Sequence, residues 1–172
     1  PLQLATDLMA QAEQDSLAAA ILLTTDSLIA DKVKQEVQYQ LQNHPQRILT
    51  EKALAHYGLI GVVETLEQAF SLSNEFAPEN LQLAVKEPWE SLEQIRHAGT
   101  IFMGNFTPKV VAEYLGGAAA PAAGIARYSS TLGVETFLKS SRVIEYSPKA
   151  IAKMSGALEL LAEAEGLVSG LE

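Results

Sequence analysis

Residues 59–70, LIGVVETLEQAF, contain a complete transition from a strand to a helix. Leu59 to Val63 is an apolar run with the length of a buried strand. Thr65 and Gln68 then have the spacing of a capping box, in which two side chains bond the free N–H groups at a helix start. The apolar face of the following helix consists of Leu66, Ala69 and Phe70. This stretch therefore predicts one β–α unit.

The same alternation continues on both sides of this unit. Further strands are expected at Ala18 to Thr24, Leu81 to Val85, Thr100 to Met103 and Arg142 to Tyr146. Helices are expected at Leu2 to Gln14, Leu28 to Leu41 and Leu49 to Ala55, and from Pro88 (presenting Trp89, Leu92 and Ile95), Pro108 and Pro148. Strands that alternate with helices over short connections favour a mostly parallel sheet covered on both faces. We therefore expect a three-layer, Rossmann-like α/β fold with a C-terminal helix.

The expected domain organisation is simple. Residues 1–146 are predicted to form the α/β domain, and residues 147–170 a C-terminal helix and tail. Leu171-Glu172 is a dipeptide that commonly precedes an expression tag, so we expect residues 171–172 to be a cloning scar.

Composition narrows the classes of function. The 172 residues carry a net charge of -9 with a pI near 4.8, which disfavours nucleic acid and anionic membrane surfaces as partners. The chain contains no cysteine, so thiolate chemistry is excluded. No apolar run approaches the ~20 residues that a membrane span needs, and no signal-peptide pattern opens the chain. We therefore expect a cytoplasmic protein.

The residues alone offer one candidate for chemistry. Glu79 lies in the turn Ala77-Pro78-Glu79-Asn80, just before an expected strand, where we expect a ligand or a catalytic group. Its neighbour Asn80 is neutral at every pH and cannot transfer a proton. The chain has no G-x-G-x-x-G, P-loop or G-x-S-x-G motif, and its three histidines are far apart. They are predicted to be surface or capping residues.

Several longer strings, taken together, carry a specific resemblance. In order, they are QAEQ at 11–14, APENL at 77–81, AGTIFMG at 98–104, ARYSS at 126–130, LGV at 132–134 and AEAEGL at 162–167. Together they resemble the C-terminal part of histidinol dehydrogenase, an enzyme that oxidises L-histidinol to L-histidine with NAD and a bound zinc. The resemblance covers nearly all of this chain and less than half of the family's usual length.

The resemblance implies roles for individual positions. Its zinc ligands fall at Gln11, at Gln14 (which replaces a His), at Glu113 (which replaces an Asp) and at Gly170, where a partner subunit's His is usual. Its acid/base pair falls at Glu79 and Asn80, the latter replacing a His. A substrate-contacting His belongs in the loop 116–121, which is shorter here and consists of Gly, Ala and Pro. Glu165 matches a carboxylate that reaches the partner's substrate.

Every functional histidine of the family is thus replaced, which predicts that the chain does not catalyse the reaction. We expect a non-catalytic scaffold that self-associates as a homodimer and binds no cofactor. It would be either an engineered half of the enzyme or a natural truncated paralogue. One alternative is a zinc- and NAD-dependent histidinol dehydrogenase that retains activity or needs a separate N-terminal half. A third is a small-molecule or protein-binding module that uses the cleft beside Glu79.

Overall fold

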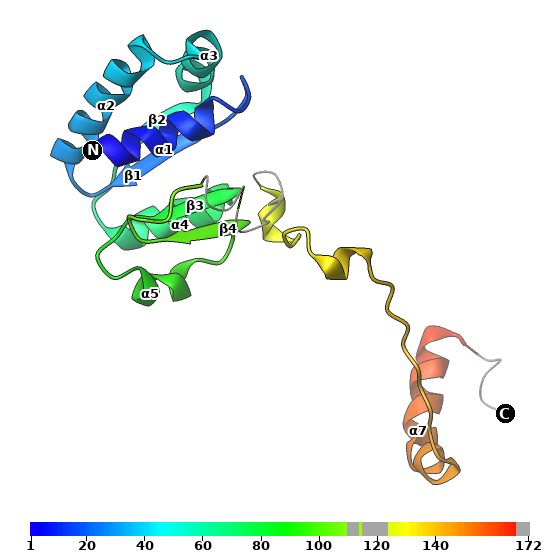
Figure 1. Ribbon diagram of the computed structural model, residues 1–172. Coiled ribbons are helices and arrows are strands. Elements are labelled where there is room, and N and C mark those ends of the chain that lie inside the picture. The colour runs from blue at the N-terminus through cyan, green and yellow to red at the C-terminus, as the bar shows by residue number, and fades with distance from the viewer. Residues whose placement is uncertain (110–113, 115–123, 168–172) are drawn as a thin grey trace. The chain divides into compact units, whose positions relative to one another are not determined.

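The computed structural model of the protein describes residues 1–109, 114 and 124–167 (Figure 1). The chain divides into two compact units, Pro1–Thr136 and Phe137–Glu172. In the part of the chain that is described, no helix is long and apolar enough to cross a membrane.

The first half of unit Pro1–Thr136 is built on one parallel strand pair. Its elements are α1 (Leu2–Ala12), β1 (Ala20–Thr24), α2 (Ser27–Gln42), α3 (Arg47–Tyr57) and β2 (Gly58–Val62). β1 pairs with β2 in parallel, from Ala20 opposite Gly58 to Thr24 opposite Val62. All three helices contact this pair. The core between α1, β1 and α3 consists of Ala12, Ala20 and Ala53, with Leu8 and Leu54 packed against them.

Local chemistry explains two of these boundaries. The carboxylate of Asp26 accepts hydrogen bonds from the N–H groups of Leu28 (2.8 Å) and Ile29 (3.3 Å), and so caps the start of α2. At the other boundary, α3 passes directly into β2 at Gly58. A Cβ atom on Gly58 would lie 2.4 Å from the carbonyl oxygen of Leu54, so only glycine allows this close approach.

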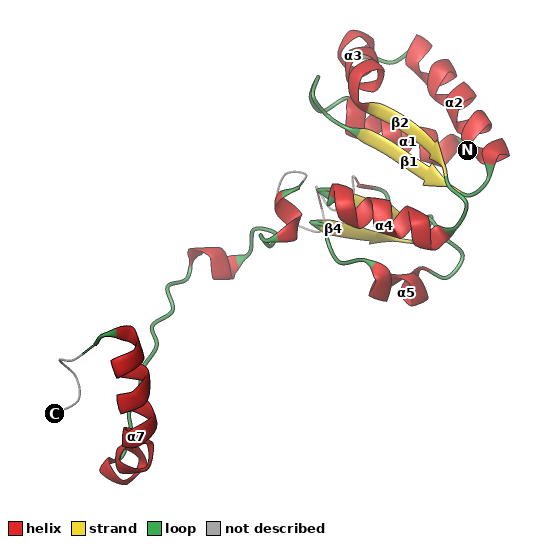
Figure 2. Ribbon diagram, turned by 180° about the vertical axis from the view of Figure 1, so that it is seen from behind, coloured by secondary structure: helices red, strands yellow, loops and turns green. Residues whose placement is uncertain are grey.

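The second half of the unit is also built on one parallel strand pair. It contains α4 (Leu66–Phe76), β3 (Asn80–Leu83), α5 (Pro88–Ser91), a 3₁₀ turn at Leu92–Gln94, β4 (Thr100–Met103) and a 3₁₀ turn at Ile125–Arg127. A further 3₁₀ turn, Val134–Phe137, includes the last residues of this unit and the first residue of the next. β3 pairs with β4 in parallel (Figure 2). The capping box is nearly as expected: Thr65 Oγ1 accepts from Gln68 N at 3.2 Å, and Gln68 Oε1 accepts from the N–H of Glu64.

The predicted α/β class with parallel strands and helices is confirmed. The described strands are hydrogen-bonded as two separate pairs, β1–β2 and β3–β4. The helix that was expected to start at Pro108 falls mostly on residues 110–113, outside the described residues. Residues 116–121, with their expected loop, also lie outside them.

The strand expected at Arg142 to Tyr146 is wrong. These residues form no regular secondary structure in unit Phe137–Glu172, and the Val143 side chain is 92% exposed. A strand needs a neighbour to satisfy its N–H and C=O groups, and no described strand pairs with this segment. The final helix is present as α7 (Pro148–Glu165), capped by the Ser147 hydroxyl, which accepts from Ala150 N at 3.2 Å.

Candidate functional site

The turn from α4 into β3 contains the expected site residue Glu79. α4 ends at Phe76, and the next residue, Ala77, adopts a left-handed conformation with φ 54° and is fully buried. An L-residue with a Cβ rarely takes this conformation, so the surrounding contacts have to hold it there. Only Pro78 and Glu79 then separate Ala77 from β3. The turn is therefore tight, and its backbone fixes the position of the Cα atom of Glu79.

Backbone hydrogen bonds hold this turn from two directions. The carbonyl oxygens of Pro78 and Glu79 accept from Gly99 N (3.0 Å) and Thr100 N (2.8 Å), at the entry to β4. The carbonyl oxygen of Ala77 accepts from Gly124 N at 2.8 Å. Glu79 therefore lies at the amino end of β3, whereas open α/β sheets usually bind ligands at the carboxyl ends of their strands. A ligand or catalytic group at Glu79 stays a prediction.

Asn80 is the first residue of β3 and is paired in register with Thr100 of β4. Both residues are half-buried, as is Glu79. The Thr100 hydroxyl is buried and, among the described residues, has no hydrogen-bond partner. Chemically, Glu79 offers a carboxylate that can accept or donate a proton. Asn80 offers an amide that can only form hydrogen bonds.

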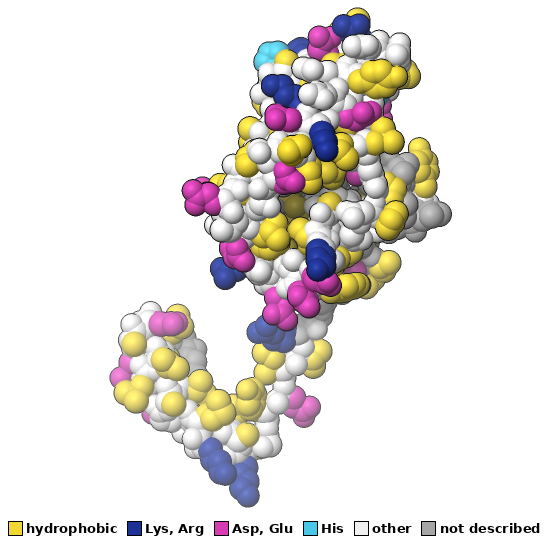
Figure 3. All heavy atoms as spheres, turned by 90° about the vertical axis from the view of Figure 1, so that its left-hand side faces the viewer, with side chains coloured by type: hydrophobic (Ala, Val, Ile, Leu, Met, Phe, Trp, Pro, Cys, Tyr) yellow, Lys and Arg dark blue, Asp and Glu magenta, His cyan; other side chains and the backbone are white. Residues whose placement is uncertain are grey.

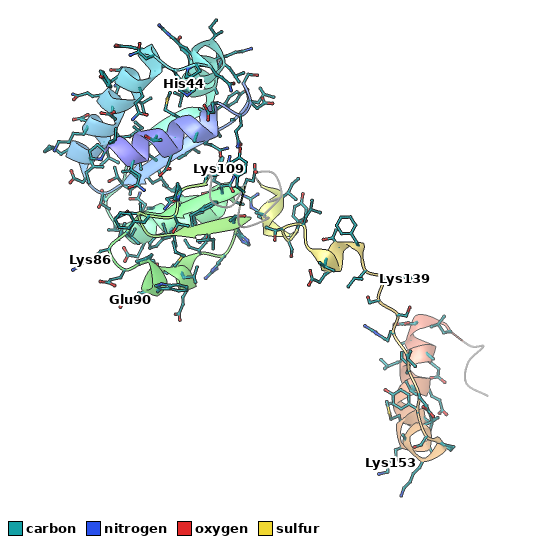
Figure 4. All side chains as sticks on the ribbon, in the orientation of Figure 1. His44, Lys86, Glu90, Lys109, Lys139 and Lys153 are labelled. Carbon is teal, nitrogen blue, oxygen red and sulfur yellow. The ribbon has the colours of Figure 1, made fainter. Side chains whose placement is uncertain are left out.

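Gln11 has a cation as its partner. Its Oε1 atom accepts a hydrogen bond of 2.9 Å from Nζ of Lys109, in the segment that follows β4. Both side chains are partly buried, and Lys109 lies between the C-terminal end of α1 and the β3–β4 pair (Figure 4). One turn earlier on α1, burial raises the pKa of the Asp7 carboxyl above its ordinary value.

Next to Gln14, the residue Glu13 lies close to a histidine. His44 Nε2 lies 3.0 Å from Glu13 Oε2, and His44 Nδ1 accepts from the N–H of Gln46 at 3.2 Å. Because a backbone N–H can only donate, the proton of the neutral ring is on Nε2 and faces Glu13. His44 thus connects the end of α1 to the start of α3 (Figure 4). Gln14 itself is exposed.

The remaining predicted positions are not brought to this place. Glu113 and Gly170 lie outside the described residues. Glu165 is the last residue of α7, in unit Phe137–Glu172, and is exposed.

The zinc that the resemblance implies does not fit the described residues. No group of three or more His, Asp or Glu side chains among them could hold a metal ion. Gln11 and Gln14 offer only neutral amide oxygens, which are weak ligands for zinc. In addition, the Gln11 oxygen already faces an ammonium group, which would repel a metal ion at the same atom.

An open groove lies between α4, the chain that leads into β4, and Arg127. It is lined by Phe70, Asn74, Glu75, Gln94, His97 and Arg127, among others. Asn74 organises this wall: its Nδ2 donates to the carbonyl oxygen of Gln94 (2.8 Å), and its Oδ1 accepts from Arg96 N (2.7 Å) and His97 N (3.2 Å). The guanidinium of Arg127 donates to the carbonyl oxygen of Glu75.

Comparison with known proteins identifies the relatives of this chain. The sequence model of the histidinol dehydrogenase family matches residues 1–171. This chain belongs to the histidinol dehydrogenase family. It is 59% identical over 171 residues to the histidinol dehydrogenase of Thermosynechococcus vestitus and 57% identical over 171 residues to histidinol dehydrogenase 2 of Trichormus variabilis. Each alignment covers 98% of this chain and 40% of the relative.

A solved structure agrees with the sequence comparison. The crystal structure of histidinol dehydrogenase from Elizabethkingia anophelis matches with a TM-score of 0.90 and 32% identity, over 99% of this chain and 40% of that one. The predicted family is therefore confirmed, and the chain spans 40% of the length of these histidinol dehydrogenases. The placement of this chain in the C-terminal part of the family stays a prediction.

Two residues that hold this region together were not predicted from the sequence. Lys109 has no motif around it, and its partner Gln11 is 98 positions away in the chain. Asn74 lies near the C-terminal end of α4, where a polar residue is usually part of a solvated face. The sequence does contain one signal for Asn74: it is an asparagine close to the end of an amphipathic helix, and the chain that follows offers backbone N–H donors.

Proposed function

We propose that this chain is a non-catalytic α/β scaffold of the histidinol dehydrogenase family that works by self-association. The observation that carries the proposal is Asn80. It stands beside the half-buried carboxylate of Glu79, in register with Thr100, at the position where the resemblance implies an acid/base histidine. A positioned proton-transfer group contributes roughly 10²–10⁴-fold to a rate, and an amide supplies none of it.

The requirements for binding NAD also support a non-catalytic role. Hydride transfer to NAD requires the nicotinamide to be held beside the substrate. The chain has no glycine-rich dinucleotide motif and spans 40% of the length of its relatives. We therefore propose that it uses neither NAD nor zinc.

Self-association is supported by α7. Ile151, Met154, Leu158 and Leu161 recur at helical spacing and form one apolar stripe, and each is at least 40% exposed. No residue of α7 is buried, and apolar side chains are exposed over this helix in Figure 3. A helix with an apolar stripe gains stability by covering it, and a second copy of the chain presents a matching stripe.

Catalysis is tested by following NAD reduction by absorbance with L-histidinol, with and without added zinc. We expect no rate above the enzyme-free blank. Turnover by the purified chain that disappears in the Glu79→Gln variant would refute the non-catalytic part of the proposal.

Association is tested by measuring molar mass in solution with light scattering across a concentration series. Leu158→Glu should shift the protein toward monomer, because it places a charge in the apolar stripe. Leu160→Glu is the matched control, since Leu160 lies on the opposite side of the helix and is already 70% exposed. A monomeric wild type, or equal effects of the two variants, would contradict association through α7.

A second candidate function is an active zinc- and NAD-dependent dehydrogenase completed by a separate chain. The family membership and the retained carboxylate of Glu79 favour it. One equivalent of zinc per chain, together with turnover after the missing part of the enzyme is added, would establish this candidate. Absence of both at saturating metal would remove it.

A further inference from the structure

Two glutamines of α1 reach the chain segment that follows β4. The side-chain amide of Gln3 donates to the carbonyl oxygen of Asn105, and the Gln11 oxygen accepts from Lys109 Nζ at 2.9 Å. Asn105 lies in a turn and Lys109 is helical, so the segment between them is not extended, and the long glutamine and lysine side chains bridge to it. Residues 105–109 therefore run past α1 in the same direction as the helix, with one attachment near each end of it.

The attachment at Gln11 has a defined polarity. A lysine ammonium has three donors and no acceptor, so the oxygen of the Gln11 amide, and not its nitrogen, must face Lys109. The last carbonyl groups of a helix also carry a partial negative charge. α1 has no basic residue in its own last turn. Lys109 thus brings to this helix end the positive charge that its own sequence lacks.

We infer that Lys109 is the resident cation of this site: its ammonium faces the oxygen of Gln11 and repels a metal ion from that atom. The contact between Gln11 and Lys109, rather than a metal, fixes residues 105–109 along α1. The zinc ligand that the resemblance implies at Gln11 is therefore used here as a structural acceptor. This inference does not depend on whether the chain is catalytic, since it concerns the charge at one atom and the path of one segment.

A double-mutant cycle tests the contact. We would measure the urea midpoint of unfolding for the wild type, Gln11→Met, Lys109→Met and the double variant. Methionine keeps an unbranched chain of similar length and removes the polar end. We expect the loss in the double variant to be smaller than the sum of the two single losses, because the second substitution removes a partner that is already gone. Other contacts of Lys109 cancel in this cycle.

A matched control uses a lysine elsewhere. Lys34 is an exposed residue of α2, so Lys34→Met combined with Gln11→Met should give additive midpoint shifts. If the Gln11–Lys109 cycle is also additive within error, the inference is overturned.

Zinc binding supplies the second readout. Calorimetric titration of the wild type with zinc should show no site that depends on Gln11, and zinc should not raise the unfolding temperature through this residue. One equivalent of zinc that is bound by the wild type and lost in Gln11→Met would overturn the inference. Neither measurement relies on enzymatic activity, so its outcome is separate from that of the proposed function.

Discussion

Removing the side chain of Asn74 should loosen the entry to β4 and destabilise the whole unit. In Asn74→Ala, the carbonyl oxygen of Gln94 and the N–H groups of Arg96 and His97 lose their partners together. Each such bond contributes about 0.5–1.5 kcal/mol net. Because Asn74 is half-buried and water can replace part of the loss, we expect a decrease of about 1.5–3 kcal/mol in the free energy of unfolding.

The assay is urea unfolding followed by circular dichroism, together with amide hydrogen exchange. For a protein of this size, that loss corresponds to a fall of roughly 3–12 °C in unfolding temperature. Exchange at the Arg96 and His97 amides should accelerate, because both lose their acceptor. Gln38→Ala is the control, since Gln38 is an exposed residue of α2.

Asn74→Asp separates the three bonds from one another. The carboxylate keeps an acceptor for Arg96 N and His97 N, and it loses the donor to the Gln94 carbonyl oxygen. We therefore expect a smaller loss than for Asn74→Ala. The reasoning is refuted if Asn74→Ala costs less than about 0.5 kcal/mol, the range of an ordinary surface substitution. It is also refuted if the two amides exchange at the wild-type rate.

Two further predictions concern α1 and α2. Burial raises the pKa of Asp7, so the folded state binds this proton more tightly than the unfolded state, and stability falls as pH rises from the ordinary value of 3.8 through the raised value. Asp7→Asn should therefore be more stable than the wild type at pH 7, and urea titrations should show this gain vanish below pH 3.8; an equal gain at both pH values would contradict the account. Asp26→Ala should lower stability by about 1 kcal/mol through loss of the α2 cap, whereas Asp31→Ala, on the exposed surface of the same helix, should change it little in the same assay.

The elements that the sequence predicts well are those with local causes. β4 has the predicted bounds, and α4 and α7 start at the predicted capping residues, Thr65 and Ser147. In each case the residues that determine the element lie within a few positions of it.

The predictions that failed depend on distant partners or on packing. The run from Arg142 to Tyr146 has strand composition, and it forms no strand because no described neighbour pairs with it. Trp89 was expected on a helical face with Leu92 and Ile95. The helix α5 ends at Ser91, a 3₁₀ turn follows, and Trp89 is 73% exposed. A spacing pattern cannot show whether the helix continues far enough to bury its face.

For the candidate site, the sequence identified positions and not contacts. Gln11, Glu79 and Asn80 were named, but the pairing of Gln11 with Lys109 joins residues 98 positions apart. Periodicity and motifs describe residues that are close together along the chain. A hydrogen bond between residues as distant as Gln11 and Lys109 can therefore be identified only from the folded structure.

The chain between Lys109 and Gly124 is held at both ends. Lys109 is bonded to Gln11 of α1, and Gly124 N donates to the carbonyl oxygen of Ala77. These two bonds tie the ends of the connection to the last part of α1 and to the residue that follows α4. A substitution at either end therefore acts on a helix terminus that is far away in the sequence.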